Sequence, residues 1–525
     1  MLSSQAQHPY DAESHSKFTT PVVAVAITLF LLWFLNTGVS QTVTAALLIG
    51  VGGVLVFLRP TAAIVATLVY LLFMGDIRRY VSMHTGLISQ DPLLLVGPAI
   101  ISLLFTRLVF ERRITVDTPL ARLVVALMIL MGLEVFNPLQ GGLTVGIAGG
   151  LFYIVPLLWF WAGRSLPTER LTGTLLKGVF PLLALAAALL GLWQTFVGPL
   201  AFEAQWIREQ IANGFNSMVI DGAVIRNFSY FTSPAEYAGF LGLGLTCCIA
   251  PVLVWRFRAS SLLIPVLVWA MFLASIRSAI VLVGLAVMSM WSMIGRDARQ
   301  VVARAFLAVV VGGGGMYFGL HRLQGALGGD SKLLDHTLEG LVNPGESSAE
   351  GHWSLTLIGV ATGLKNPIGE GLGATTMAAS KFSTHGGGFE NDVANMFASL
   401  GVFGGLLYVG TILYVLYHTC TVWRQRRSMV ALMTLGVLLS QIGYWLEGGH
   451  YALVAICWFL IGSIDRVRPV AERQVAADEG LAWAAEPHAG VAAAARRQPR
   501  RAPIGAAQAP SWRPPAASAG VGDAQ

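Results

Sequence analysis

Charged residues are scarce in this chain. Only 12% of its 525 residues are Asp, Glu, Lys or Arg, whereas 55% are hydrophobic. Soluble globular proteins carry roughly 25% charged residues, so the composition excludes an ordinary soluble domain. Apolar stretches of the length that spans a bilayer, about 20 residues, recur along most of the chain. They are continuous instead of alternating, which excludes a transmembrane barrel and predicts an all-α polytopic membrane protein.

Cysteines and metal-binding motifs are also scarce. The four cysteines lie in or beside apolar stretches, where they predict small buried side chains and no disulfide framework. The chain contains no Asp-x-Asp pair, no HExxH motif and no Cys/His pattern with metal-ligand spacing. These absences disfavour a Mg²⁺-dependent nucleotide-sugar transferase and a zinc hydrolase. We therefore expect no metal and no other cofactor.

The chain divides into three parts. Residues 1–20 are polar and lack a basic segment and a cleavage site, so we expect a cytoplasmic tail and a retained first span. Residues 21–463 predict a polytopic membrane domain with about 12–14 transmembrane helices. Residues 464–525 are rich in Ala, Pro, Gly and Arg, a composition that predicts a disordered tail.

The distribution of Lys and Arg predicts the topology. One alternating set of loops holds most of them: Arg59, Arg107, Arg112, Arg113, Arg164, Arg170, Lys177, Arg256, Arg258, Arg296, Arg299, Arg304, Arg424, Arg426 and Arg427. The positive-inside rule places these loops and both termini in the cytoplasm. The exceptions are Arg78, Arg79 and Arg277. The pattern also requires a turn inside 261–294, because one span there would separate Arg256 from Arg296.

Two long loops, 198–236 and 318–394, face the opposite, outer side of the membrane. The second is rich in Gly, His and Glu and contains the glycine-rich run Asn366–Gly373. We interpret this run as a flexible backbone able to approach a ligand. A protein that only crossed the bilayer would not need such residues. The large outer loop therefore indicates chemistry at the membrane surface.

Two arginines on this side are candidates for binding an anion. Arg277 stands in the tight turn Ser275-Ile-Arg-Ser278, where it interrupts the positive-inside pattern. A charge near bilayer depth usually meets an anion or a cavity, and a guanidinium fork suits a diphosphate. Snorkelling to the interface is the alternative for Arg277. Arg226 precedes the eighth span beside aromatic residues, and the alternative for it is a surface charge.

Histidines in the large loop are further candidates. Trp353, Leu357, Ile358, Ala361 and Leu364 recur at helical spacing and predict an amphipathic helix on the outer membrane face. His352 begins this helix, either as a base or phosphate donor or as an exposed or capping residue. His385, later in the loop, is a weaker substrate-binding candidate.

Glu390 and Asn391 directly precede the twelfth predicted span. A helix N-terminus favours Asn as a cap and an acid in the first turn, so capping is one interpretation. The other is catalytic, because a partly desolvated carboxylate at the outer mouth of the helices can act as a general base.

With these residues in view, the chain resembles the O-antigen ligase/polymerase superfamily, which includes Wzy-type polysaccharide polymerases and lipopolysaccharide O-antigen ligases. The resemblance is strongest from Arg226 to Gly410. Its motifs are Phe136-Asn-Pro138, Ser275-Ile-Arg-Ser278, His352-Trp353, Asn366-Pro-Ile-Gly-Glu-Gly-Leu-Gly373, Gly388-Phe-Glu-Asn391 and Leu400-Gly-Val-Phe-Gly404. O-antigen ligases typically carry His-Asn where this chain has Glu390-Asn391. The pair is more similar to exopolysaccharide polymerases, which disfavours a ligase.

The resemblance implies a metal-independent, GT-C-like membrane glycosyltransferase that polymerises undecaprenyl-diphosphate-linked repeat units at the periplasmic face of the inner membrane. Arg277 and Arg226 would bind the diphosphate, Glu390 or His352 would deprotonate the acceptor, and Asn391 would orient the site. Alternatives are an O-antigen ligase and a flippase, although the spans are nearly free of charge. The implied partners are the lipid-linked glycan, membrane lipid, and a chain-length regulator and flippase of the same pathway, with no nucleic acid.

Overall fold

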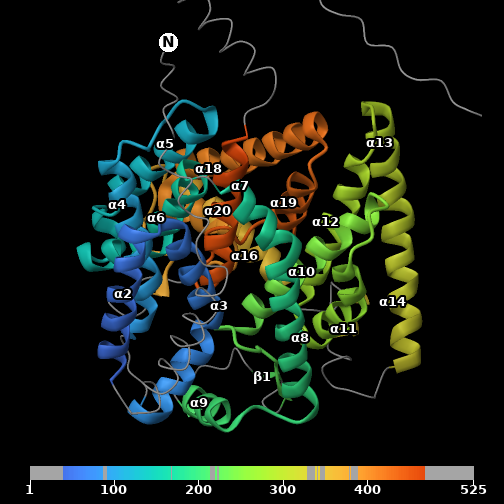
Figure 1. Cartoon of the computed structure of the whole chain (residues 1–525), viewed down its shortest axis with the longest axis horizontal. Helices are drawn as coiled ribbons and strands as arrows, with labels where there is room; N and C mark the ends of the chain where they lie inside the picture. Colours follow the sequence, from blue (N-terminus) through green and yellow to red (C-terminus); the bar gives the residue numbers. More distant parts are fainter. Residues whose placement is uncertain are drawn as a thin grey trace, which may run out of the picture. The chain divides into compact units, whose positions relative to one another are not determined.

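The structure is a computed structural model that describes residues 40–86, 91–166, 168–212, 219–220, 224–327, 337–339, 341–342, 349–377, 379 and 388–467. The described part is all-α apart from a hairpin of two-residue strands, β1 (Val219–Ile220) and β2 (Val224–Ile225). Figure 1 shows this arrangement. The predicted N-terminal tail, the first predicted span (residues 21–35) and almost the whole C-terminal tail lie outside the described residues.

The helices of the first half are α2 (Gln41–Leu58), α3 (Pro60–Thr85), η2 (Pro92–Leu95), α4 (Val96–Phe110), α5 (Pro119–Glu134), η3 (Pro138–Gln140), α6 (Leu143–Ser165), α7 (Glu169–Thr174), η4 (Leu175–Val179), α8 (Phe180–Phe196) and α9 (Ala201–Ala212). Those of the second half are α10 (Pro234–Leu253), η5 (Ala259–Leu263), α11 (Ile264–Ala274), α12 (Arg277–Met293), α13 (Ala298–Leu307), η6 (Ala308–Gly313), α14 (Gly314–Leu327), α16 (Ala349–Lys365), α18 (Asp392–Arg426), α19 (Met429–Ser440) and α20 (Tyr451–Asp465).

Eight helical stretches in the described ranges are long and apolar enough to cross a membrane, and four shorter apolar helices accompany them. The prediction of a multi-pass α-helical membrane protein is confirmed at this level. One predicted boundary was wrong. The span predicted to end at Tyr317 continues through η6 and α14 to Leu327, so the following loop starts later than residue 318. The loop 198–236 contains the helix α9.

The arginine-rich loops meet at one end of the helices. Arg107 donates to the backbone carbonyls of Val56 and Phe57 at the end of α2. Arg256 and Arg296 line one cavity although α11 and α12 lie between them in the chain. The break predicted inside 261–294 is therefore present: α11 ends at Ala274, α12 begins at Arg277, and the two helices bring the chain back to the same end. We call this the basic end.

Arg78 and Arg79, two exceptions to the arginine pattern, form ion pairs at the end of the helices opposite the basic end. Arg78 Nε lies 2.5 Å from Asp91 Oδ2. Arg79 is buried, lies 3.0 Å from Asp76 Oδ1 and donates to the carbonyl of Phe231. Both arginines therefore have an acidic partner, as charged residues in membrane proteins usually do.

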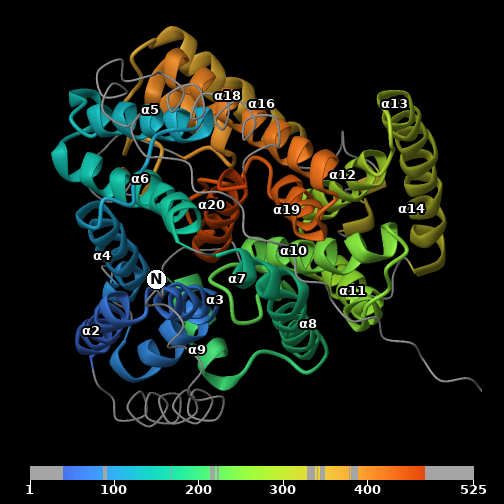
Figure 2. The same cartoon turned by 45° about the horizontal axis from the view of Figure 1, so that its top comes forward.

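The helices α6 and α20 approach each other at two glycines. A Cβ at Gly163 would overlap the carbonyl of Phe459, and a Cβ at Gly462 would overlap the carbonyl of Phe160. Small residues permit such close contact between membrane helices. At the basic end Arg164 Nε pairs with the buried Asp465 Oδ2 at 2.6 Å. In Figure 2 α20 lies centrally, near α6, α10, α18 and α19.

The helix α18 reverses direction at Gly401, which has φ 69° and ψ −171°. The Tyr408 hydroxyl donates to Asp392 Oδ2 at 2.7 Å, although the residues are 16 positions apart. In one straight helix they would be about 24 Å apart. Residues 392–400 are therefore a short helix that folds back along the helix that follows. The span predicted from Asn395 to Tyr417 is present, but its predicted start was wrong, because the spanning helix begins only after Gly401 and continues to Arg426.

The glycine-rich run is a packed turn. Gly369 and Gly371 have φ values of 101° and 100°. The amide of Glu370 donates to the Ala398 carbonyl at 2.9 Å, and Asn137 Nδ2 donates to the Gly369 carbonyl at 3.1 Å. The interpretation of this run as a backbone open to ligand was wrong, because neighbouring protein backbone fills the space beside it. The turn instead holds the reversal of α18 in place.

We predict that Gly401→Ala destabilises the protein. With φ 69° and ψ −171°, Gly401 occupies a backbone region essentially restricted to glycine. Another residue there costs about 1–3 kcal/mol, and the new Cβ would also overlap the Pro367 carbonyl. The control is Gly410→Ala, which lies in the same helix with no atom within 4 Å of a new Cβ and should be neutral or stabilising by up to about 1 kcal/mol. The thermal unfolding midpoint of the detergent-purified protein checks this. Equal midpoints would contradict the reversal.

Candidate functional site

The ten-residue segment from Gln441 to His450 connects α19 to α20 and forms the centre of the candidate site. Our sequence analysis assigned its first part to a span and gave it no role. Trp445 and Leu446 are fully buried, whereas Glu447 is half-buried. The segment contacts the N-terminal ends of three helices, α10, α12 and α18, as the following contacts show.

The first contact is with Asp392 on α18. Asp392 is fully buried. Its Oδ2 accepts from the Tyr408 hydroxyl and from the Leu446 amide, the latter at 2.9 Å, and its own amide donates to the Gly443 carbonyl at 2.9 Å. Charge-assisted bonds of this kind are the stronger ones in a protein. One carboxylate therefore joins the folded-back helix, the spanning helix and the segment 441–450.

Glu447 lies beside this carboxylate. Asn395 Nδ2 donates to Glu447 Oε2 at 3.3 Å. Burial raises the pKa of the Glu447 carboxyl to about 9, and the negative charge of Asp392 adds to the increase. A carboxyl with this pKa is protonated at neutral pH and acts as a hydrogen-bond donor or a general acid. Glu447 thus provides a proton donor beside the acceptor oxygens of Asp392.

His450 and Tyr444 connect the segment to α12. Their rings stack with centroids 5.4 Å apart. Burial lowers the pKa of His450 to about 4, so the imidazole is neutral at pH 7. Burial raises the pKa of Tyr444, whose hydroxyl bonds the side chain of Ser278. Ser278 directly follows Arg277, the first residue of α12. The predicted anion-binding turn therefore contacts the segment 441–450.

The third contact is with α10. Thr232 Oγ1 lies 3.0 Å from the Gly449 carbonyl and 2.6 Å from Glu236 Oε2. Glu236 Oε1 accepts from the Ala452 amide at 2.8 Å. Glu236 is fully buried. These bonds anchor the start of α20 to the start of α10, and they hold the C-terminal part of the segment 441–450.

The structure places Asn391 and Glu390 at this cluster. Asn391 is the N-cap of α18: its side chain accepts from the Ala394 amide and donates to Thr356 Oγ1 at 2.6 Å. The capping interpretation of Asn391 is therefore correct. Glu390 directly precedes it and is exposed. The residue is thus exposed directly beside the N-cap of α18.

The helix α16 reaches the cluster through Thr356. Gly359 and Gly363 pack on Ala394 and Phe397, so α16 lies along the folded-back part of α18. His352 lies in α16 one turn before Thr356, and its side chain lies outside the description. The predicted apolar stripe is exposed, with Trp353 at 65%, as expected for a lipid-facing surface. His385 lies outside the described residues.

Arg226 has a different local setting. It follows β2, and its neighbour Asn227 donates to Thr195 Oγ1 on α8 at 2.9 Å. The next residues, Phe228 and Ser229, donate their amides to Gln194 Oε1. These contacts attach the backbone around Arg226 to the end of α8.

Comparison with family models, with curated proteins and with solved structures gives no match. The geometry and the sequence motifs therefore carry the functional argument.

We predict that Glu447→Gln becomes more stable relative to wild type as the pH rises. The folded pKa of about 9 lies above the unfolded value, so wild type loses stability between about pH 4.5 and 9 as the unfolded chain ionises first. Glutamine mimics the protonated acid and removes this loss. The unfolding midpoints should differ by roughly a few degrees more at pH 9 than at pH 5. The exposed Glu169→Gln is the control; a pH-independent difference would refute the burial of Glu447.

Proposed function

We propose that the protein is a metal-independent, GT-C-like glycosyltransferase that polymerises glycan repeat units carried on undecaprenyl diphosphate. The observation that carries this proposal is the convergence of Arg277, Glu390, Asn391, Glu447 and His450 around one segment. The sequence motifs supply the substrate class, because Arg277 and Glu390-Asn391 belong to the elements that resemble polysaccharide polymerases. The site would lie at the periplasmic face.

The position of the cluster supports this orientation. The basic end gathers Arg107, Arg164, Arg256, Arg296 and Arg427. The cluster is built on the opposite ends of α10 and α12, because each helix carries its site residue at its start and reaches the basic end where it stops. If the basic end faces the cytoplasm, the cluster faces the compartment in which lipid-linked repeat units are polymerised.

The residues support a direct displacement. Arg277 binds the diphosphate and stabilises its charge while the bond from the anomeric carbon to the diphosphate oxygen breaks. Glu390 or His352 takes the proton of the acceptor hydroxyl, whose oxygen bonds the anomeric carbon, and undecaprenyl diphosphate leaves. Protonated Glu447 donates a hydrogen bond to the reacting sugars, and Asn391 keeps the start of α18 in place.

We predict that Arg277→Ala abolishes polymer formation while the protein still inserts into the membrane. Arg277→Lys should restore little activity, because a single ammonium cannot bind two phosphate oxygens as a guanidinium fork does. The assay is polymer laddering with purified lipid-linked repeat unit. Arg208→Ala, an exposed arginine of α9, is the matched control and should be fully active. Wild-type polymer yield from Arg277→Ala would exclude this role.

A second pair of variants separates the two bases. If Glu390 is the base, Glu390→Gln should keep donor binding and lower turnover by roughly 10²–10⁴-fold. His352→Gln should then weaken donor binding more than turnover. Donor binding and laddering are measured on the same preparations. An active Glu390→Gln together with an inactive His352→Gln that still binds donor would make His352 the base.

A further inference from the structure

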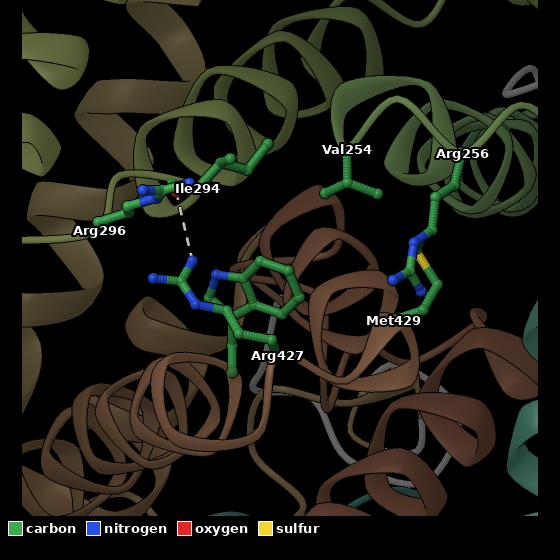
Figure 3. A pocket seen from close by; sticks show the side chains of 7 residues that line it. Val254, Arg256, Ile294, Arg296, Arg427 and Met429 are labelled. Carbon is green, nitrogen blue, oxygen red and sulfur yellow. Dashed lines mark hydrogen bonds between the residues drawn. The ribbon is translucent and has the colours of Figure 1, made fainter.

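A cavity of about 440 Å³ lies at the basic end, away from the cluster described above. Three arginines line it: Arg256 after α10, Arg296 between α12 and α13, and Arg427 between α18 and α19. Figure 3 shows their side chains around the opening. Val254, Ile294 and Trp423 provide apolar surface beside them. The cavity thus combines three cationic groups with an apolar wall.

The charge in this cavity is not balanced by nearby acids. No Asp or Glu is among its lining residues within the described ranges. The ion pairs found between described residues do not include Arg256, Arg296 or Arg427. Asp297, next in sequence to Arg296, uses Oδ1 to cap the Gln300 amide at 2.8 Å. Three guanidiniums in one cavity without a carboxylate favour an anion supplied from outside.

One arginine is fixed in place by the protein. Arg427 Nη2 donates to the Gly295 carbonyl at 3.1 Å, Nη1 donates to the Ile294 carbonyl at 3.3 Å, and the guanidinium lies 5.3 Å from the Trp423 ring centroid. Met429, the first residue of α19, also lines the cavity, and Ser428 makes no side-chain cap there. The positive end of the α19 dipole therefore adds to the potential.

The surroundings indicate a lipid. The cavity lies where α10, α12 and α18 end, the level at which membrane helices meet the headgroup region. Trp255 and Phe257 flank Arg256 and are 85% and 71% exposed. Aromatic residues in such positions are typical of the membrane interface, and basic pockets between membrane helices bind anionic headgroups.

We propose that Arg256, Arg296 and Arg427 bind the phosphate group of an anionic phospholipid whose glycerol region lies on the apolar wall. The lipid contacts the turns that follow α10, α12 and α18. At their other ends α10 and α12 carry residues of the cluster around 441–450, and the folded-back start of α18 carries Asp392. Binding therefore stabilises the arrangement of the helices that hold the proposed catalytic residues, whatever reaction they perform.

The test uses the full-length protein purified in a neutral detergent. Its unfolding midpoint is measured against added phosphatidylglycerol, phosphatidylcholine or inorganic phosphate. We expect stabilisation by phosphatidylglycerol alone. The variant R256Q/R296Q/R427Q should need at least about tenfold more of this lipid, since arginines near an anionic lipid surface contribute to its binding. R256Q/R296Q keeps the Arg427 bonds to α12 and should show the same direction if the triple variant does not fold.

The matched control is R258Q/R299Q/R424Q, which removes three exposed arginines at the same end that do not line the cavity. It should respond to phosphatidylglycerol as wild type does. An equal loss in this control would replace the site with diffuse surface charge and overturn the proposal. Equal stabilisation by phosphatidylcholine would also overturn it. Stabilisation by inorganic phosphate to the same extent would overturn the lipid assignment in favour of a soluble phosphate compound.

Discussion

The hydrogen bonds of the buried Asp392 hold together the end of the helices opposite the basic end. A charged or polar group away from water needs partners within the protein, and Asp392 finds them in Tyr408 and in the backbone of the segment 441–450. These partners come from three stretches of chain that would not otherwise meet. The same bonds make the reversal at Gly401 necessary, because only a folded-back start of α18 brings Asp392 to Tyr408.

The cluster around this carboxylate places groups with different protonation behaviour side by side. Glu447 holds its proton at neutral pH and His450 lacks one, both because of burial. Glu390 is exposed at the edge. A reaction that moves a proton from an acceptor and stabilises a departing anion needs a base, a donor and a cation close together. In the reaction that we propose, Glu390 would be the base, Glu447 the donor and Arg277 the cation.

Much of the helical framework could be predicted, because apolar length and the Lys/Arg alternation follow from the cost of polar groups in lipid. The turn at Arg277 was predicted from Arg256 and Arg296 alone. The reversal at Gly401 could not be, since it depends on a long-range bond between Asp392 and Tyr408. The role of the segment 441–450 was missed for a similar reason. Trp445 and Leu446 continue the apolar stretch of α19, and only the packing shows that Glu447 and His450 belong to the same cluster. The repeated glycines near the end of α19 were the available signal.

The contact between α6 and α20 limits which parts can move. The backbone of Gly163 lies against Phe459, and the backbone of Gly462 lies against Phe160. The ion pair between Arg164 and Asp465 joins the same two helices at the basic end. Two helices in such close contact move as one rigid unit. His450 is the N-cap residue of α20 and belongs to this unit. On this side the proposed site is therefore bounded by a part of the protein that does not move. A movement that widens the proposed site would therefore involve α12, which begins at Arg277, and α16, which carries the exposed apolar stripe.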